Sequence, residues 1–215
     1  MTPQPLADLP VVPDIHLSRV KALLADGRRK LLGLVGPPGA GKSTLATALQ
    51  RAFAGVSQVV PMDGFHLANV ELQRLGYAGR KGAPDTFDVA GYAALLQRLR
   101  QQGDGEIIYA PEFHREIEEA VAGAIAVLPS TQLVITEGNY LLLDHGPWAC
   151  IAALLDDAWY VEADEALRTE RLVQRHQHFG RSAQAARDWV DGIDQPNARL
   201  IAATRGLAQH VFRWS

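Results

Sequence analysis

The sequence contains one cysteine, no surplus of basic residues and no long apolar run. A single cysteine excludes an internal disulfide and a zinc site built from cysteines. With 21 lysines and arginines against 24 aspartates and glutamates, the formal net charge is −3. The chain therefore lacks the excess of positive charge that is typical of nucleic-acid-binding proteins. No apolar run reaches the ~18 residues of a membrane helix, and the N-terminus lacks the basic-then-apolar pattern of a signal peptide. We therefore expect a cytoplasmic protein with no nucleic-acid or membrane partner.

The rest of the composition is that of an ordinary globular protein. The chain has 215 residues, 47% of them hydrophobic, which suffices for one sizeable core. We expect a single domain over residues 1–215, part of which forms a lid. Cys150 lies in the apolar stretch 148–155, where a free cysteine is expected to be a small core residue.

The most specific motif lies at residues 36–43, Gly-Pro-Pro-Gly-Ala-Gly-Lys-Ser, which fits the pattern G-x-x-x-x-G-K-[ST] of a phosphate-binding loop. The apolar run 31–35 before it predicts a buried strand, and residues 44–53 after it have helical periodicity. Glycines let the backbone N–H groups of such a loop point at phosphate oxygens, at the positive end of the helix. This context favours a nucleotide site over a chance glycine-rich turn. The predicted nucleotide contacts are Gly36, Pro38, Gly39, Ala40, Gly41, Lys42, Ser43 and Thr44.

Two acidic residues directly follow predicted strands. A short strand that starts at residue 57 ends at Asp63, and a strand over 132–137 ends at Glu137. Short strands alternating with helices predict an α/β protein with the three-layer fold of P-loop NTPases and a central five-stranded parallel sheet. Ligands of such sheets lie at the carboxyl ends of the strands. We therefore expect both carboxylates to lie beside the phosphate loop.

Phosphoryl transfer from ATP requires groups that hold the phosphates, hold Mg²⁺ and accept the proton of the acceptor hydroxyl. Lys42 is expected to reach the β- and γ-phosphates, and Ser43 to ligate Mg²⁺. We assign Asp63 as the base and Glu137 to the metal, with Asp63 as a further metal candidate. The sequence alone leaves open which carboxylate has which role, and a solvated or helix-capping carboxylate is the alternative for each.

A basic helix is predicted in the C-terminal third of the chain. Its residues Arg168, Arg171 and Arg175 are spaced i, i+3 and i+7, so they share one face. A guanidinium binds phosphate bidentately and keeps its charge, which suits it to neutralise the transferred group. A solvated helix surface is the alternative. Gly180 as a hinge, together with the phosphate loop, favours a helical lid over about residues 165–182, with Arg171 and Arg175 as catalytic residues.

Other polar residues lie in segments that would face the acceptor. We predict acceptor contacts at His66, Arg80, Asp85 and Arg115, and a solvated loop position is the alternative for each. His66 and Asp85 each sit in a compact motif.

Three further elements are predicted from local signals. Asp14 is expected to cap a helix that ends at Gly27, because glycine favours helix ends. Asp88 is expected to cap a helix over residues 89–99. Residues 106–109 are a strand candidate.

Taken together, these motifs resemble the superfamily of phosphoribulokinases, uridine kinases and pantothenate kinases, in the same order along the chain. The motifs are the phosphate loop, residues 61–66 (Pro-Met-Asp-Gly-Phe-His), 81–88 (Lys-Gly-Ala-Pro-Asp-Thr-Phe-Asp), 134–142 (Val-Ile-Thr-Glu-Gly-Asn-Tyr-Leu-Leu) and the arginines of 171–175. The chain looks most like the short bacterial members labelled nucleoside/nucleotide kinases or fructose-transport-system kinases. Such members are often homo-oligomers.

The resemblance implies a role for each matching residue. Asp63 matches the family's catalytic aspartate, Glu137 the acidic residue that helps to hold Mg²⁺, and Arg171 and Arg175 the lid arginines. Asp85 falls where family members contact the acceptor. The segment 196–198 resembles the one that borders the adenine, which makes Asn197 a candidate nucleotide contact.

The function that we expect is an ATP- and Mg²⁺-dependent kinase that phosphorylates a hydroxyl of a small molecule, a sugar such as fructose or a nucleoside. Arg80-Lys81-Gly82 is closer to the pantothenate kinase form than to uridine kinases, yet the chain lacks the N-terminal extension of pantothenate kinases, so another metabolite is the alternative. A nucleotide-switched GTPase and a transport ATPase are disfavoured because the chain has neither an Asn-Lys-x-Asp nor a Leu-Ser-Gly-Gly motif. A nucleotide-binding regulatory protein without turnover is the remaining alternative.

Overall fold

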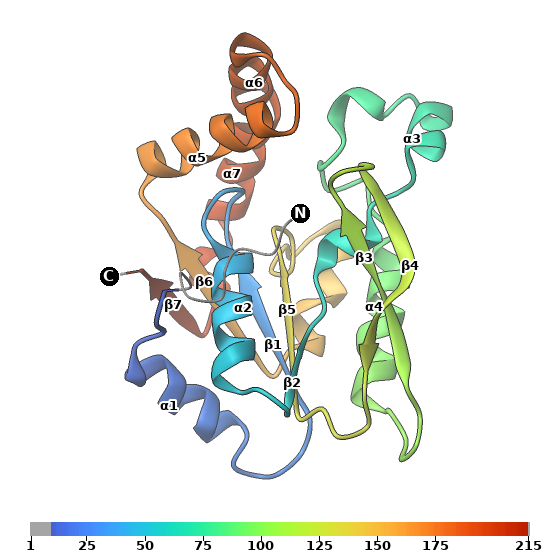
Figure 1. Cartoon of the computed structure of the whole chain (residues 1–215), viewed down its shortest axis with the longest axis vertical. Coiled ribbons are helices and arrows are strands. Elements are labelled where there is room, and N and C mark those ends of the chain that lie inside the picture. Colours follow the sequence, from blue (N-terminus) through green and yellow to red (C-terminus); the bar gives the residue numbers. More distant parts are fainter. Residues whose placement is uncertain (1–9, 215) are drawn as a thin grey trace.

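The computed structural model describes residues 10–214, and the remainder of the expected domain, residues 1–9 and 215, lies outside them. Its centre is one parallel sheet of five strands (Figure 1). In spatial order the strands are β2 (Ser57–Val59), β5 (Leu133–Gly138), β1 (Lys30–Val35), β6 (Asp157–Glu162) and β7 (His210–Arg213). Every neighbouring pair is parallel. The predicted five-stranded parallel sheet is confirmed.

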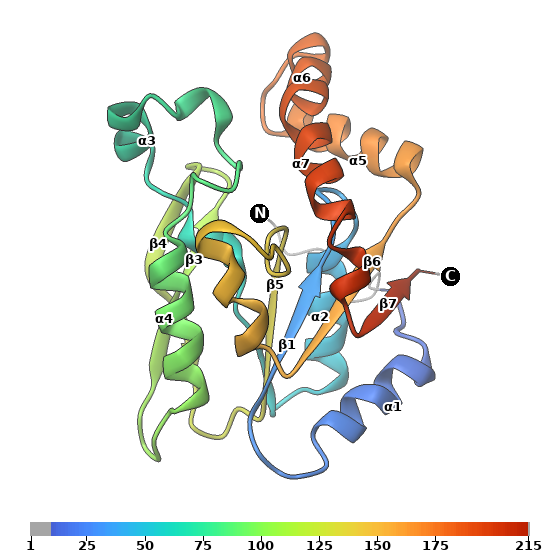
Figure 2. The same ribbon diagram turned by 180° about the vertical axis from the view of Figure 1, so that it is seen from behind.

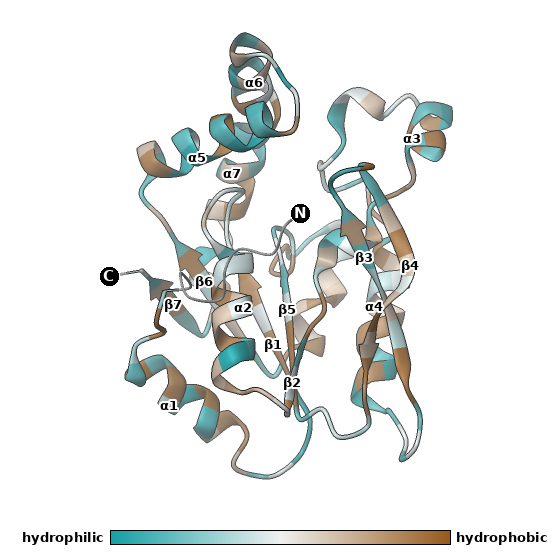
Figure 3. Ribbon diagram, viewed as in Figure 1, coloured by the Kyte–Doolittle hydropathy of each residue, from teal (hydrophilic) through white to brown (hydrophobic). Residues whose placement is uncertain are grey.

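Helices cover both faces of this sheet, because the central strands are apolar on both sides. In β1, Leu32 and Leu34 pack with α1 (Asp14–Leu23) and α2 (Lys42–Ala52), whereas Leu31 and Val35 pack against the opposite layer. That layer contains α4 (Val89–Arg100), the turns at residues 146–154 and α7 (Gln195–Ala202) (Figure 2). The result is the predicted three-layer α/β arrangement. Figure 3 shows the hydrophobic colouring along β1 in the middle of the molecule.

Two groups of elements extend beyond the carboxyl ends of the strands as separate arms (Figure 1). The first arm consists of α5 (Glu165–His178) and α6 (Ala183–Trp189), and a π-helical turn at 190–194 connects it to α7. The second arm consists of α3 (Asn69–Leu75) and the upper end of an antiparallel hairpin, β3 (Ile108–His114) and β4 (Glu119–Val127), whose strands otherwise run alongside α4 (Figure 1). None of the helices within residues 10–214 combines the length and the apolar character needed to span a bilayer.

The helix ends test two of the predicted caps. Asp88 caps α4 as predicted, because its carboxylate accepts a hydrogen bond of 2.8 Å from the Gly91 N–H. The prediction for Asp14 was wrong. Pro13, with an extended backbone, precedes the helix, and Asp14 is its first residue. Among the described residues, the Asp14 carboxylate makes no capping hydrogen bond to a free N–H. Its negative charge is instead stabilised by the positive end of the helix dipole.

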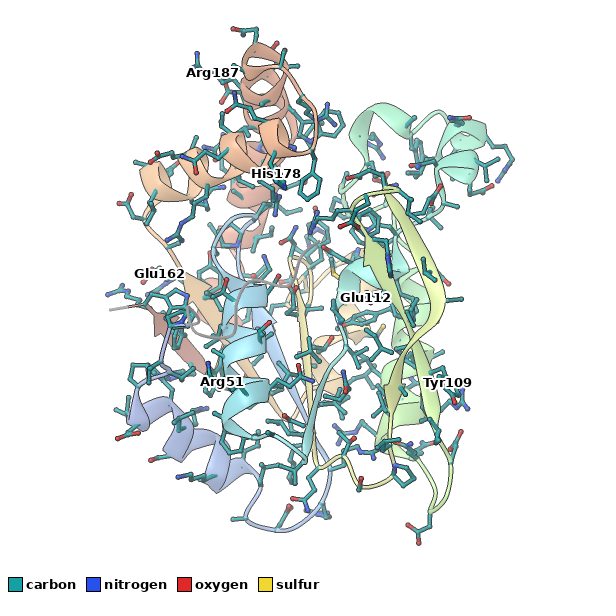
Figure 4. All side chains as sticks on the ribbon, in the orientation of Figure 1. Arg51, Tyr109, Glu112, Glu162, His178 and Arg187 are labelled. Atoms are coloured by element: carbon teal, nitrogen blue, oxygen red, sulfur yellow. The ribbon has the colours of Figure 1, made fainter. Side chains whose placement is uncertain are left out.

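The strand candidate at 106–109 was misplaced. The strand begins at Ile108 and continues to His114, and among residues 10–214 it pairs only with β4, in a separate two-stranded sheet. Ile108 and Val127 face the core beside α4, whereas Tyr109 is 58% exposed and points away from the body of the molecule (Figure 4). β4 escaped prediction because its alanines and glycine carry little of the β-branched signal of a strand.

Cys150 is exposed, which corrects the expectation of a core cysteine. Residues 146–150 form a 3₁₀ turn, and the Cys150 thiol lies 3.4 Å from the Pro147 carbonyl oxygen. Trp148 and Ile151 occupy the buried positions of this apolar stretch. A tight turn of three residues eclipses positions i and i+3 and so turns Cys150 away from the core.

A pair of histidines joins α1 to the edge of the sheet. Because of this pair, we expect the stability of the fold to decrease in acid. Nδ1 of His16 lies 2.8 Å from Nε2 of His210, and both rings contact Trp159. Burial lowers the pKa of both imidazoles below the ordinary 6.5. Between that value and the lower folded pKa the unfolded chain binds more protons, so the free energy of unfolding should decrease as pH falls below 6.5.

Urea unfolding at a series of pH values checks this expectation. His16→Gln should flatten the decrease between about pH 7 and 5. The exposed His178 is the matched control, and His178→Gln should keep the slope of the unmodified protein. An identical slope in His16→Gln would show that the pair does not carry the effect.

Candidate active site

A cavity of about 940 Å³ lies at the carboxyl end of the central strands, between the two arms. Arg187 on α6 and Glu112 on β3 mark the two arms in Figure 4. The walls of the cavity include the phosphate loop, the turn after β2, the end of β5, helix α5 and the loop after β3. Segments far apart in the sequence therefore meet at the place that the parallel topology predicts for a ligand.

The phosphate loop joins β1 to α2 and contributes Pro38, Gly39, Gly41 and Ser43 to the cavity wall. Gly41 precedes the helix with φ of +90°, a left-handed conformation that glycine adopts without strain. The first N–H groups of α2 thus lie at the cavity, where they can bind an anion. Among the predicted contacts, Gly36 and Ala40 support the loop from behind and are not part of the wall.

Lys42 lies across this loop and is 7% exposed. Its Nζ donates hydrogen bonds to the carbonyl oxygens of Gly36 (2.9 Å) and Pro37 (3.1 Å) and to Oδ1 of Asn139 (2.8 Å). Burial lowers the pKa of Lys42 to about 8, although the carboxylates of the cavity favour its charged form. The ammonium group is therefore held within the loop at the position where phosphate oxygens would bind.

Ser43 and Glu137 meet as the sequence predicts. The hydroxyl of Ser43 donates a hydrogen bond of 2.7 Å to Oε1 of Glu137, which lies within the buried strand β5, near its carboxyl end. Burial and the neighbouring charge of Asp63 raise the pKa of Glu137.

These oxygen donors fit Mg²⁺ rather than a transition metal. Within residues 10–214 no three histidine, cysteine or acidic side chains gather as a complete metal site. Mg²⁺ ordinarily takes one or two carboxylates and fills its other positions with phosphates and water. Ser43 and Glu137, with Asp63 on the same cavity, match that incomplete set of hard oxygen ligands.

Asp63 lies in a 3₁₀ turn, Met62–Phe65, shortly after β2. The turn packs closely on the hairpin, since a Cβ at Gly64 would lie 2.3 Å from the carbonyl oxygen of Pro111. One carboxylate oxygen of Asp63 is 3.2 Å from Nη2 of Arg115, and 29% of the side chain is exposed. Burial acts to raise the pKa of Asp63, but the surrounding positive charges outweigh it and hold that pKa below its ordinary value. The group is therefore ionised at neutral pH.

The arginines of α5 divide into two kinds. Arg171 and Arg175 line the cavity, as the prediction of lid arginines requires. Arg168 does not, because it is buried and donates to the Pro38 carbonyl (3.2 Å) and to Oε1 of Gln195 (2.5 Å). It therefore fastens the phosphate loop to the lid arm, which corrects its assignment to charge neutralisation.

The predicted acceptor contacts also divide. His66 and Arg115 line the cavity, and the His66 ring lies between those of Phe87 and Phe113, with centroid distances of 4.1 and 4.6 Å. The structure does not bring Arg80 and Asp85 to the cavity wall. They form an ion pair with each other at the surface, because opposite charges five residues apart meet across this turn.

Two amide side chains complete the site. Asn197 lines the cavity, and its Nδ2 lies 3.5 Å from the Gly82 carbonyl oxygen. Its contact with adenine stays a prediction. The sequence did not identify Asn139 as a site residue, although its Oδ1 accepts a hydrogen bond from Lys42. Its position two residues after Glu137, at the same strand end, is the signal that could have identified it.

Comparison with known proteins identifies the family of this site. The model of the phosphoribulokinase/uridine kinase family matches residues 31–199. A Schizosaccharomyces pombe protein provisionally named a uridine kinase is 35% identical over 195 residues, covering 86% of this chain and 83% of that protein. YggC of Escherichia coli K12 is 35% identical over 194 residues, which are 88% of this chain and 79% of YggC.

A solved structure shares the architecture as well as the sequence. It is a protein of Silicibacter sp. TM1040 provisionally named a fructose transport system kinase, 38% identical to this chain with a TM-score of 0.81. The match covers 91% of this chain and 98% of that one. The segment matched by the family model includes the phosphate loop, both carboxylates and the lid arginines. The chain therefore belongs to the phosphoribulokinase/uridine kinase family and is a P-loop kinase.

Proposed function

We propose that the protein transfers the γ-phosphoryl group of ATP to a hydroxyl of a small metabolite. The observation that carries this proposal is the convergence of Lys42, the Ser43–Glu137 pair, Asp63 and the lid arginines on one cavity. Each of these groups meets one requirement of phosphoryl transfer. A chain that only bound a nucleotide would need the loop but neither the base nor the lid arginines.

The nucleotide would bind with its phosphates on the loop. The first N–H groups of α2 and the ammonium of Lys42 would contact the β- and γ-phosphates. There they would stabilise the negative charge that develops during transfer of the phosphoryl group. Ser43 and Glu137 would hold Mg²⁺, which when bound neutralises phosphate charge. Because Glu137 is buried and already bonded to Ser43, it suits the metal better than the acceptor.

Asp63 would act as the base. It is ionised and partly open to the cavity, so its carboxylate can accept the proton of the acceptor hydroxyl. The acceptor oxygen then forms a bond to the γ-phosphorus while the bond from that phosphorus to the β,γ-bridging oxygen breaks, and ADP leaves. Arg171 and Arg175 on α5 would stabilise the charge on the transferred group, and closure of the lid over residues 165–182 would exclude water.

The family leaves the acceptor open among hydroxylated metabolites. Similarity to proteins provisionally named for uridine and for fructose transport suggests a nucleoside or a sugar such as fructose. Relatives named pantothenate kinase suggest a hydroxy acid. An enzyme that consumes ATP to phosphorylate such metabolites fits a cytoplasmic location.

Release of ADP from Mg·ATP tests the proposal. The rate is measured alone and with fructose, other free sugars, nucleosides, pantothenate and pentose phosphates. We expect one class of acceptor to raise the rate at least about tenfold above that with water alone, since binding of the true acceptor positions its hydroxyl. ATP binding without stimulation by any class would instead support the regulatory alternative.

A further inference from the structure

Two cations line the cavity on the side away from the lid arginines. Lys81 and Arg115 line the cavity from the second arm, in the turn before α4 and in the loop after β3. In the proposed function, Lys42, Arg171 and Arg175 would supply positive charge around the phosphates from the loop and the opposite arm. The charges on the second arm therefore face the part of the cavity left for the acceptor.

Both cations are held beside the same aromatic ring. Nζ of Lys81 lies 5.2 Å from the ring centroid of Phe113, and Cζ of Arg115 lies 5.8 Å from it. Phe113 itself lines the cavity. Attraction to an aromatic ring favours each cation individually, but two like charges beside one ring repel each other. An anion bound between them would relieve that repulsion.

Lys81 is fixed in place mainly by neutral oxygens. Its Nζ donates to Oδ1 of Asn69 (2.6 Å) and to the carbonyl oxygen of Glu118. That carbonyl belongs to a residue with φ of +53°, and it also accepts from Nδ2 of Asn69. Burial lowers the pKa of Lys81, and the carboxylates of Glu119 and Glu118 oppose this by favouring its charged form. The carboxylate of Glu119 is itself engaged, because it accepts a hydrogen bond of 3.0 Å from the Asn69 backbone N–H. The strained turn thus presents a positioned ammonium to the cavity.

Arg115 has donors to spare. Within residues 10–214 its one hydrogen bond runs from Nη2 to Asp63, at 3.2 Å. A guanidinium has five N–H donors in a planar fork that matches carboxylate and phosphate groups. Arg115 can therefore hold an anion while it remains next to Asp63.

We propose that the acceptor carries an anionic group, a carboxylate or a phosphate, bound by Arg115 and Lys81 close to the hydroxyl that is phosphorylated. This inference rests on the proposed kinase function and narrows its acceptor. Free sugars and nucleosides become poor acceptors, and sugar acids, hydroxy acids or sugar phosphates become good ones. Because Arg115 contacts Asp63 directly, the anion and the reactive hydroxyl lie next to each other, which favours a compact acceptor.

The same contact links acceptor binding to the base. An anion on Arg115 competes with Asp63 for the guanidinium, which frees the carboxylate to accept the hydroxyl proton. The acceptor oxygen then bonds to the γ-phosphorus as the bond to the β,γ-bridging oxygen breaks, with ADP as the leaving group. A neutral acceptor leaves the ion pair between Arg115 and Asp63 intact.

Matched acceptor pairs test the inference through ADP release with Mg·ATP. The pairs are glycerol and glycerate, glucose and gluconate, and fructose and fructose 1-phosphate, so that carboxylates and a phosphate are compared separately with neutral partners. We expect the charged member of at least one pair to have a kcat/KM at least about tenfold above its neutral partner, as charge-assisted hydrogen bonds would give.

Variants assign that preference to the two cations. Arg115→Gln and Lys81→Gln should each lower kcat/KM for the charged acceptor about tenfold or more, largely through KM, and reduce the preference over the neutral partner. Arg115→Lys, which retains the charge, should keep more of the preference than Arg115→Gln. The control is Arg74→Gln on α3 of the same arm, where the exposed Arg74 pairs with Glu71 outside the cavity. Thermal unfolding confirms that each variant is folded.

The outcomes separate this inference from the function on which it rests. Transfer to neutral acceptors as efficient as to their charged partners overturns the inference and leaves the kinase function standing. An equal loss for both members of a pair in folded Arg115→Gln and Lys81→Gln overturns it as well. Bound ATP without ADP release for any member of any pair, and for any class of the wider acceptor panel, contradicts the proposed function, and the inference with it.

Discussion

Asp63→Asn is expected to lower acceptor-dependent turnover by about 10²–10⁴-fold, the usual contribution of a positioned general base. Asparagine has the same size as aspartate and fits the turn against Pro111, but its amide cannot accept the hydroxyl proton at neutral pH. The affinity for ATP should change little, because the phosphate loop and Lys42 remain. Steady-state ADP release with the best acceptor, together with equilibrium binding of ATP, checks both expectations.

Asp85→Asn is the matched control, because Asp85 lies outside the cavity wall and pairs with Arg80 at the surface. It should retain turnover close to that of the unmodified protein. Near-normal turnover in Asp63→Asn would mean that the base is a different group, with Glu137 as the next candidate. A loss in Asp85→Asn equal to that in Asp63→Asn would place the acceptor on the surface turn instead.

Lys42→Met is expected to lower turnover by about 10²–10³-fold, as removal of one preorganised donor to a developing charge does in other enzymes. Methionine fills most of the buried volume of the lysine stem, so the loop should fold. The substitution, however, removes the ammonium that in the proposed function would contact the γ-phosphate. Single-turnover phosphoryl transfer at saturating ATP separates this loss from weaker nucleotide binding.

Lys21→Met on the exposed side of α1 serves as the control for the loss of a lysine charge. Its turnover should be unchanged. If Lys42→Met transferred phosphate at the rate of this control, the loop would bind nucleotide without assisting the chemistry. Such a result would support the regulatory alternative.

The parts of the site that the sequence predicts are those in which short-range order fixes the geometry. The phosphate loop is one continuous segment, so its residues determine its shape. Asp63 and Glu137 are separated along the chain, but Glu137 lies near the carboxyl end of β5 and Asp63 in the turn that follows β2, and the topology brings such strand ends together. The observed cavity contains both carboxylates.

The parts that escaped prediction depend on contacts between distant segments or on the face of a short turn. Arg168 shares a helix face with Arg171 in the sequence pattern, yet packing against Pro38 and Gln195 buries it. Arg80 and Asp85 occur within a motif, but their mutual ion pair keeps them at the surface. No local signal shows which way a side chain turns in such a segment.

The hairpin shows the same limit at the level of the fold. β4 reads Glu-Ala-Val-Ala-Gly-Ala-Ile-Ala-Val, and alanine and glycine are weak strand formers. The strand becomes evident only through its pairing with β3. Yet Arg115 directly follows the first strand of this hairpin, and the hairpin packs on the turn of Asp63. The proposed acceptor end of the cavity therefore depends on an element that the sequence barely indicates.

The fate of the γ-phosphoryl group tests the central claim most directly. The unmodified protein is incubated with Mg²⁺ and ATP labelled in the γ-phosphate, with and without the acceptor that most stimulates ADP release, and the products are separated. We predict that the label appears on the acceptor in amounts equal to the ADP formed, with little free phosphate. Label found only as inorganic phosphate, whether or not acceptor is present, would contradict a kinase and indicate an ATPase.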